Sequence, residues 1–394
     1  MVRKVVWQVL PLITFLIQLT IASPGDDLYA FLDCLYQCEE ITCHKNPYHI
    51  IQEEYRRELE ASPGFEFQYY NGNWHFDDMP LPLHLRLLLW NCESNCDYQC
   101  QQIITRERKE HEEEIYQFHG KWPFWRIFGI QELASMIFSI GNFVVHYIGF
   151  KKMCRAYSSR EADANLKYAY FNTILISVIT MGAWLCSTIF HIRDFDITER
   201  MDYYFAGLTV LSGFHSIGAR ILGLFRPDRK LARYIFGGLC VAAYSAHIYR
   251  LVTDWLYTYN MQANVTVGLL QNGCLCILCY NLYSKYYELE QGKSMNLEHL
   301  NYIDFKRIIL PSFYSSSPKL YSLYPLILST IVVLGMSLEI FDFPPFFYDL
   351  IDAHSLWHLV TIFPAYLGWY DWMIWDINEN VRDEIASLVA KKND

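Results

Sequence analysis

The sequence has few charged residues and no excess of basic ones. Only 19% of its 394 residues are charged, whereas about a quarter are charged in an ordinary soluble domain. Its 32 lysines and arginines are outnumbered by 42 acidic residues, which excludes the broad basic surface of a nucleic-acid-binding protein. Internal repeats and long disordered segments are also lacking, so we expect neither a repeat architecture nor a disordered chain.

Hydrophobic residues, in contrast, make up 53% of the chain, and aromatic residues make up 17%. Such aromatic enrichment is typical of helix ends at membrane–water interfaces. Apolar runs of the roughly 20 residues that cross a bilayer core recur along the chain, and the fifth is interrupted by Gln271 and Asn272. The runs lie near 127–150, 168–191, 201–223, 234–254, 263–285, 320–340 and 353–374. We therefore expect an all-α membrane protein in which residues 127–374 form a seven-transmembrane helix bundle.

The amino-terminal segment is typical of a secretory signal peptide. Residues 1–22 combine two basic residues, an apolar stretch and the small residue Ala22 before Ser23, as a cleavable signal does. An uncleaved first anchor is the alternative. In either case residues 23–126 are expected to face the lumen. This region carries 19 acidic residues against 9 lysines and arginines, whereas the rest of the chain is balanced.

Half of the twelve cysteines lie in this lumenal region, in two clusters of three. Within each cluster three or four residues separate the cysteines, which places them along one face of a helix. The oxidising lumen favours disulfides between two such helices over a zinc cluster, but six cysteines allow many pairings. The disulfide candidates are Cys34, Cys38, Cys43, Cys92, Cys96 and Cys100. The other six cysteines lie in or beside apolar runs and are expected to be packing residues.

Basic residues predict the orientation of the bundle, because cytosolic loops are enriched in lysine and arginine. Such residues cluster after the first run (151–167) and after the third (226–233), so the amino terminus should be lumenal and the 375–394 tail cytosolic. The tail ends in Lys391-Lys392-Asn393-Asp394, which resembles the dilysine signal that retrieves membrane proteins to the endoplasmic reticulum. The sequon at Asn264 would then be a lumenal glycosylation candidate close to the membrane.

Five polar residues within the runs are predicted to form one site, since ionisable groups inside a membrane are costly and usually functional. Ser187 and His191 are four residues apart at the end of the second run, and His354 and His358 are four apart at the start of the seventh. Each pair therefore shares a helix face. Asp202 lies in the first turn of the third run. The predicted topology places all five at a similar depth on the lumenal side.

These residue types suit metal-dependent hydrolysis. Three neutral imidazoles and a water complete the coordination of a catalytic zinc, and zinc lowers the pKa of water to about 7. Asp202 could orient or deprotonate that water, and Ser187 could donate a hydrogen bond to a developing oxyanion. A hydrolase that uses Ser187, Asp202 and His191 is an alternative, but it leaves the other two histidines unexplained. Histidine sites also accept manganese, iron or copper, so the sequence does not identify the metal.

Other polar residues of the runs have less definite roles. Glu132, early in the first run, could line the pocket or form a structural hydrogen bond. His146, His215 and His247 are expected to bond neighbouring helices. Arg193 and Arg200 could meet an anionic head group, although interfacial arginines usually contact lipid phosphate.

Several motifs together resemble a known family. They are STIFHIRDFDITERMDYYFAG (187–207), DAHSLWH (352–358), QFHGKWPF (117–124) and the six-cysteine region. They are similar to those of the phospholipases that remodel the lipid of glycosylphosphatidylinositol (GPI) anchors after attachment to protein, and the resemblance covers essentially the whole mature chain. These phospholipases belong to a superfamily of seven-span hydrolases with the alkaline ceramidases and adiponectin receptors. The residues that the superfamily shares match Ser187, His191, Asp202, His354 and His358 without departure.

The resemblance implies a substrate that the residues alone do not. It implies zinc-dependent cleavage of the sn-2 acyl ester of the anchor phosphatidylinositol, with GPI-anchored proteins and membrane lipid as partners. It places the reaction in the endoplasmic reticulum of fungi or the Golgi of animals, and the dilysine-like tail favours the former. A ceramidase-like amidase with the same five residues is one alternative. A seven-span receptor or transporter with a structural metal is another. The oligomeric state is not indicated.

Overall fold

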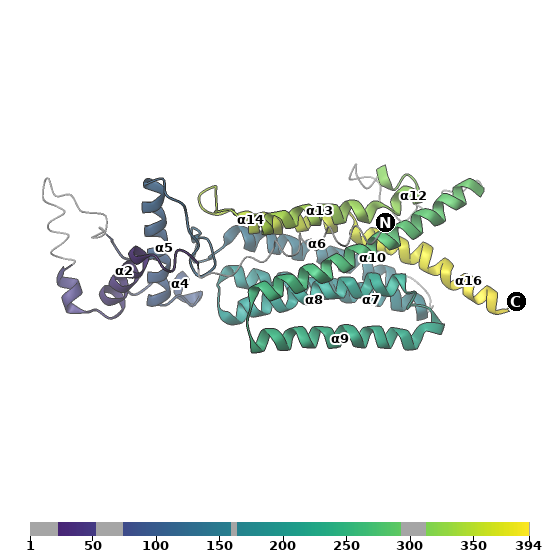
Figure 1. The fold of residues 1–394 in the computed structure, drawn as a ribbon, viewed down its shortest axis with the longest axis horizontal. Coiled ribbons are helices and arrows are strands. Elements are labelled where there is room, and N and C mark those ends of the chain that lie inside the picture. The colour runs from purple at the N-terminus through teal and green to yellow at the C-terminus, as the bar shows by residue number, and fades with distance from the viewer. Residues whose placement is uncertain (1–22, 53–73, 159–163, 293–312, 394) are drawn as a thin grey trace, which may run out of the picture.

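The computed structural model describes residues 23–52, 74–158, 164–292 and 313–393. The predicted signal peptide and most of the 286–318 loop lie outside these residues. Across the described ranges the regular structure is helical, and β pairing is limited to isolated bridges, which confirms the predicted all-α class. Figure 1 shows a small cysteine-rich region at one end of a long helix bundle.

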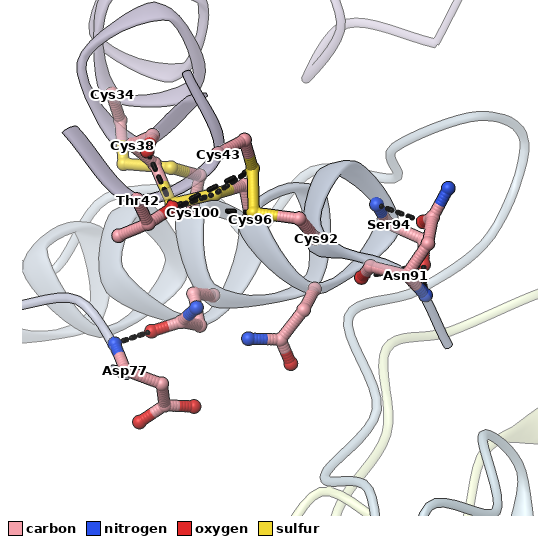
Figure 2. The surroundings of a disulfide bond; sticks show 12 residues. Cys34, Cys38, Thr42, Cys43, Asp77, Asn91, Cys92, Ser94, Cys96 and Cys100 are labelled. Carbon is pink, nitrogen blue, oxygen red and sulfur yellow. Dashed lines mark hydrogen bonds between the residues drawn. A yellow bond between two sulfur atoms is a disulfide. The ribbon is translucent and has the colours of Figure 1, made fainter. Parts of the chain in front are cut away.

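The cysteine-rich region is built on two helices, α2 (Tyr29–Cys38) and α5 (Cys92–Glu110), with a short π-helix, η1 (Glu39–Cys43), and the short helix α4 (Leu83–Leu87). Three disulfides join α2 and η1 to α5 (Figure 2). They are Cys34–Cys100, Cys38–Cys96 and Cys43–Cys92, with Cα–Cα separations of 5.8, 5.6 and 5.6 Å. Successive cysteines of the first segment pair with cysteines ever earlier in α5, so the two segments run antiparallel. The predicted disulfides are thereby confirmed, and the pairing is resolved.

The bundle follows the predicted apolar runs. Its helices are α6 (Leu133–Ser158), α7 (Ala164–Ile192), α8 (Asp196–Ile221), α9 (Lys230–Thr253), α10 (Tyr257–Gly292), α13 (Tyr324–Ile340) and α14 (Ala353–Tyr366). Shorter helices, η2 (Pro227–Arg229) and α12 (Pro318–Tyr321), precede α9 and α13. The main contacts join α6 to α7 and α14, α7 to α8, α8 to α10, and α13 to α14. Figure 1 shows α9 along one side of the bundle, where it packs chiefly on α8.

Five helical segments of the described chain are long and apolar enough to cross a membrane: Leu133–Ser158, Leu166–Ile192, Pro227–Thr253, Tyr257–Gln291 and Pro318–Ile340. This result confirms the membrane character. The third and seventh predicted spans, on α8 and α14, do not meet the same standard. Four charged residues lie in the first two turns of α8, and the rest of that helix contains Arg220, a histidine and several small residues that lower its mean hydropathy. Helix α14 is only 14 residues long. The count of seven spans therefore stays a prediction.

The ends of the first and seventh predicted spans differ from the structure. Residues 127–130 form a tight turn, in which Ile127 and Ile130 exchange backbone hydrogen bonds, so α6 begins only at Leu133. The seventh span is interrupted at Gly368, whose φ of 112° is open to glycine but not to bulkier residues. Pro364 within α14 also removes one helical hydrogen bond just before the break.

The chain continues past this break as α15 (Trp369–Trp375), η4 (Asp376–Val381) and α16 (Arg382–Asn393). The start of the predicted 375–394 tail is packed rather than free. Asp376 is buried and forms an ion pair with Arg220 of α8, with Nε and Oδ2 2.6 Å apart. Ile377 and Ile385 join the hydrophobic core between α6 and α7. Figure 1 shows α16 at the end of the bundle opposite the cysteine-rich region.

Candidate metal centre

The local structure of two helices aligns four of the predicted site residues. Ser187 and His191 lie one turn apart at the end of α7. The start of α14 is set by a capping box, in which Ser355 N donates to Asp352 Oδ1 (2.8 Å) and Asp352 N donates to Ser355 Oγ (2.9 Å). This cap fixes the first turn of α14. His354 and His358 therefore project from one face of that helix.

The structure brings the three predicted histidines together. One ring nitrogen of each lies within 4.8 Å of those of the other two. The ring centroids of His191 are 5.4 Å from His354 and 4.9 Å from His358, and those of His354 and His358 are 4.5 Å apart. His191 and His358 are buried, whereas His354 is partly exposed. The cluster is therefore accessible from the His354 side.

Each imidazole is held at Nδ1 by an oxygen from a different helix or loop. The three contacts, each 2.8 Å long, are His191 to Glu132, His354 to Glu339 and His358 to Ser139. A carboxylate only accepts, so His191 and His354 donate from Nδ1. Ser139 donates its own proton to the Ser135 carbonyl, so it accepts from His358. All three Nε2 atoms consequently keep their lone pairs.

This arrangement fits a metal ion. Nδ1–H donation to a carboxylate or another oxygen is the usual support for a metal-ligating histidine. Nε2 of His191 is buried and has no hydrogen-bond partner among the described residues. An orphaned buried nitrogen is unfavourable unless something outside the chain binds it. Three neutral nitrogen donors with one side open are the ligand set of a catalytic zinc site.

Glu132 positions His191, one of the three candidate metal ligands. Its Oε2 contacts His191, and its Oε1 accepts from Lys121 Nζ at 2.6 Å. Lys121 also lies 3.1 Å from Asp194 Oδ2 and 3.8 Å above the ring of Phe190. The backbone N–H of Glu132 donates to the carbonyl of His191 (3.0 Å). The sequence left two roles open for Glu132, lining the pocket or forming a structural hydrogen bond. In the structure Glu132 forms hydrogen bonds to His191 and Lys121.

Ser187 and Asp202 lie near the histidines without joining them. Ser187 is buried, with its Oγ 3.2 Å from Ser139 Oγ, so one hydroxyl separates it from His358. Asp202 of α8 is partly buried and interacts electrostatically with His191 and His354. It is outside the group whose ligand atoms lie within 4.8 Å of one another.

Sequence reasoning missed three supporting residues, Glu339, Ser139 and Lys121. Glu339 lies in the last turn of α13 and inside the sixth predicted run, so its charge within an apolar run was a signal that could have found it. Ser139 resembles any serine within an apolar helix. Lys121 stands in the QFHGKWPF motif, which pointed to the region but not to this residue.

Other predicted residues lie away from this centre. Asn264 is in the interior of α10, where its Nδ2 donates to Asn260 Oδ1 at 3.1 Å. Its Oδ1 lies 3.3 Å from where a side chain on Gly207 of α8 would begin. A sequon asparagine in a helix-packing position is a poor glycosylation acceptor. His146 contacts Tyr370 Oη at 2.7 Å, a bond between helices of the kind predicted for it.

Comparison with known proteins identifies the family of the chain. Residues 82–377 match the Per1-like family. The chain is 43% identical over 365 residues to Protein PER1 of Saccharomyces cerevisiae, covering 91% of this chain and 93% of that protein. It is 28% identical to a Mus musculus protein named GPI-specific phospholipase A2-like PGAP3, covering 89% of this chain and 88% of its relative. A Drosophila melanogaster relative, named Post-GPI attachment to proteins factor 3, is 30% identical over 88% of this chain and 87% of its own length.

No solved structure matches the chain. The family match includes all three histidines, and the yeast relative is matched over nearly its whole length. The chain therefore belongs to the Per1-like family.

Proposed function

We propose that this protein hydrolyses the sn-2 acyl ester of the phosphatidylinositol in GPI anchors, leaving a lyso form on the attached protein. The observation that carries the proposal is the convergence of one ring nitrogen from each of three histidines at one end of an apolar bundle, with Nε2 of His191 buried and unpartnered among the described residues. Relatives named GPI-specific phospholipase A2-like support the choice of ester and substrate. By the predicted topology this end of the bundle and the cysteine-rich region would face the lumen, and the dilysine-like tail favours the endoplasmic reticulum as the compartment.

His191, His354 and His358 would hold the metal, and zinc suits three neutral nitrogen donors best. When bound, zinc supplies a Lewis acid that polarises the ester carbonyl and makes water more acidic. The oxygen partners of the three Nδ1 atoms keep the ligand rings in position. The partly exposed edge at His354 is where the ester would enter.

Two further residues of the chain would handle the proton and the developing charge. Asp202 would orient the attacking water and accept its proton at a carboxylate oxygen. Ser187 would donate its hydroxyl proton to the oxyanion that forms from the ester carbonyl. In the structure this hydroxyl lies 3.2 Å from Ser139 Oγ, and it would turn from Ser139 to the oxyanion as the charge develops. Both residues are buried or partly buried, which strengthens such interactions by excluding water.

The test is a lipid analysis of cells whose only copy is wild type or His354→Ala. GPI-anchored proteins are purified, their phosphatidylinositol is released, and its acyl chains are measured by mass spectrometry. We expect the variant to retain the unsaturated sn-2 chain that wild type removes. His75→Ala, which changes an exposed histidine of the cysteine-rich region, should behave as wild type.

Two results would contradict the proposal. Identical anchor lipids in wild type and His354→Ala would show that the histidine cluster does not catalyse this step. Accumulation of ceramide with normal anchor lipids would instead support the amidase alternative.

A further inference from the structure

Large apolar side chains stand exposed where the cysteine-rich region meets the bundle. The most exposed of them include Leu87 of α4 (71%), Phe128 before α6 (79%) and Tyr348 before α14 (80%). We call the set the apolar rim. It consists of Leu83, Leu87, Leu89, Phe128, Phe347 and Tyr348. A group of exposed large apolar side chains near one end of a bundle can mark a contact with a membrane or a partner.

The rim is one fixed surface, because the three segments that carry it are tied together. Trp90, just after α4, donates its indole N–H to the carbonyl of Gly129 (2.8 Å), in the turn that holds Phe128. Trp125 N, just before that turn, donates to the carbonyl of Asp349 (3.0 Å), next to Tyr348. Lys109 of α5 also pairs with the Asp349 carboxylate at 2.6 Å.

The backbone at the rim is unusual. Leu89, Phe128, Phe347 and Tyr348 have φ values of 61°, 52°, 51° and 59°. They are half of the eight non-glycine residues with positive φ in the described chain. Bulky residues rarely adopt this conformation, which is unfavourable for them. These residues lie in turns that backbone hydrogen bonds close, such as those between Ile127 and Ile130 and between Phe346 and Ile351. The turns therefore hold the four side chains outward, where all of them are exposed.

The geometry points to the lipid leaflet on the metal-site side as the occupant of the rim. Phe128 lies five residues before α6, and Phe347 and Tyr348 lie in the short loop that joins α13 to α14. The rim thus continues the lipid-facing surface of helices that are apolar enough to cross a membrane. Figure 1 shows α4 close to the same end of the bundle.

The composition of the rim also suits the boundary between head groups and acyl chains better than a protein groove. Aromatic residues concentrate at that depth. Arg86, exposed on α4 between Leu83 and Leu87, can direct its charge to lipid phosphate while its stem stays among apolar groups. With the rim immersed, the cysteine-rich region lies against the bilayer, and the histidine cluster sits near the interface. The inference depends on membrane residence and is independent of the reaction.

The test is photocrosslinking with the full chain in phosphatidylcholine vesicles that carry an alkyne on an acyl chain. The photoreactive residue p-benzoylphenylalanine replaces Leu87 or Phe347 in the rim. Val333, an exposed residue of α13, is the positive control for lipid contact. Tyr48 is the negative control, because it is exposed to a similar degree. It lies in the helical stretch 47–52, which Figure 1 shows in purple, away from the bundle.

We expect lipid adducts at Leu87 and Phe347 that approach the yield at Val333, and none above background at Tyr48. Rim positions that react no more than Tyr48 would overturn the inference, as would crosslinks to a second copy of the chain in place of lipid. If either variant fails to accumulate, Phe128 and Tyr348 provide further positions on the same surface.

Discussion

Residue by residue, the three histidines differ in what supports them. His191 is held by a carboxylate that is itself paired with a lysine, His354 by a carboxylate near a tyrosine, and His358 by a hydroxyl. The lysine matters because an ionised carboxylate is costly to bury unless a cation or several donors stabilise it. Lys121 therefore links the cysteine-rich region to the metal centre through Glu132.

The first prediction concerns this link. Lys121→Met should leave Glu132 without its cation, so that it holds the His191 ring less firmly. Loss of such an outer contact typically lowers metal affinity by about 10–100-fold. The measurement is the zinc content of purified protein after dialysis against a graded chelator.

Lys121→Arg, which keeps the charge, should retain most of the zinc. Lys319→Met, at an ion pair with Glu290 far from the site, is the matched control. Equal zinc retention in Lys121→Met and wild type would show that the lysine does not position the ligand.

A second prediction separates ligands from groups that act on the substrate. His358→Ala should lose both zinc and deacylation activity. Ser187→Ala and Asp202→Asn should keep zinc, because neither residue joins the ligand cluster. Their turnover should still fall, by about 10²–10⁴-fold if Asp202 transfers the proton. Zinc is measured on the purified protein and turnover on released anchor lipid. If Asp202→Asn loses zinc, Asp202 must be assigned as a metal ligand, which would contradict the prediction.

Among the helices, the contact between α13 and α14 places Glu339 against His354. It depends on Gly335 of α13, one turn before Glu339. A Cβ at Gly335 would lie 2.6 Å from Val360 Cγ1 and 3.2 Å from the Trp357 ring of α14. Small residues allow helices to approach closely within membranes. The glycine therefore determines how near the two helices lie, and with it the contact between Glu339 and His354.

The third prediction follows from this close approach. Gly335→Ala should push α13 from α14 and lower the thermal stability, since overpacking typically costs about 1–3 kcal/mol. Zinc retention should fall with it, because Glu339 moves away from His354. Gly273→Ala in α10, where a Cβ meets nothing within 4 Å, should be neutral or slightly stabilising. Thermal unfolding in detergent compares the variants. A wild-type melting temperature and zinc content for Gly335→Ala would contradict the argument.

At the scale of the whole molecule, His119 joins distant parts of the cysteine-rich region. Its Nε2 lies 2.8 Å from Asp97 Oδ1 of α5, and its backbone N–H donates to Asp26 Oδ1 at 2.8 Å. The hydrogen bond to Asp97 raises the pKa of His119 above its usual 6.5. His119 stands two residues before Lys121, so this junction also positions the segment that reaches the metal centre.

The fourth prediction is the pH dependence of that junction. A histidine whose pKa is higher in the folded state stabilises the fold below its unfolded pKa, and this contribution is lost as pH rises through the folded pKa. Stability of the cysteine-rich region should therefore decline as pH increases through a value somewhat above 6.5. His119→Gln should remove this decline. Hydrogen exchange of α5 peptides measures it, and an unchanged pH profile in His119→Gln would contradict the assignment.

Much of the architecture was predictable from the sequence because local physics determines it. Runs of apolar residues specify helices whichever way these later pack, and spacings of four residues place Ser187 with His191 and His354 with His358. The six cysteines in two helical clusters indicated disulfides. The convergence of the histidines was predictable as well, because topology assigns a depth to each helix end.

Other features were decided only by the tertiary structure. The disulfide pairing depends on the antiparallel course of α2 and α5, which the spacings do not specify. The roles of Glu339, Ser139 and Lys121 depend on contacts between segments far apart in the chain, and such contacts leave no periodic signal. The break at Gly368 and the outward rim arise from backbone conformations that hydropathy does not record. Composition and spacing determine which groups lie at a given depth in the membrane, but only packing determines which of them touch.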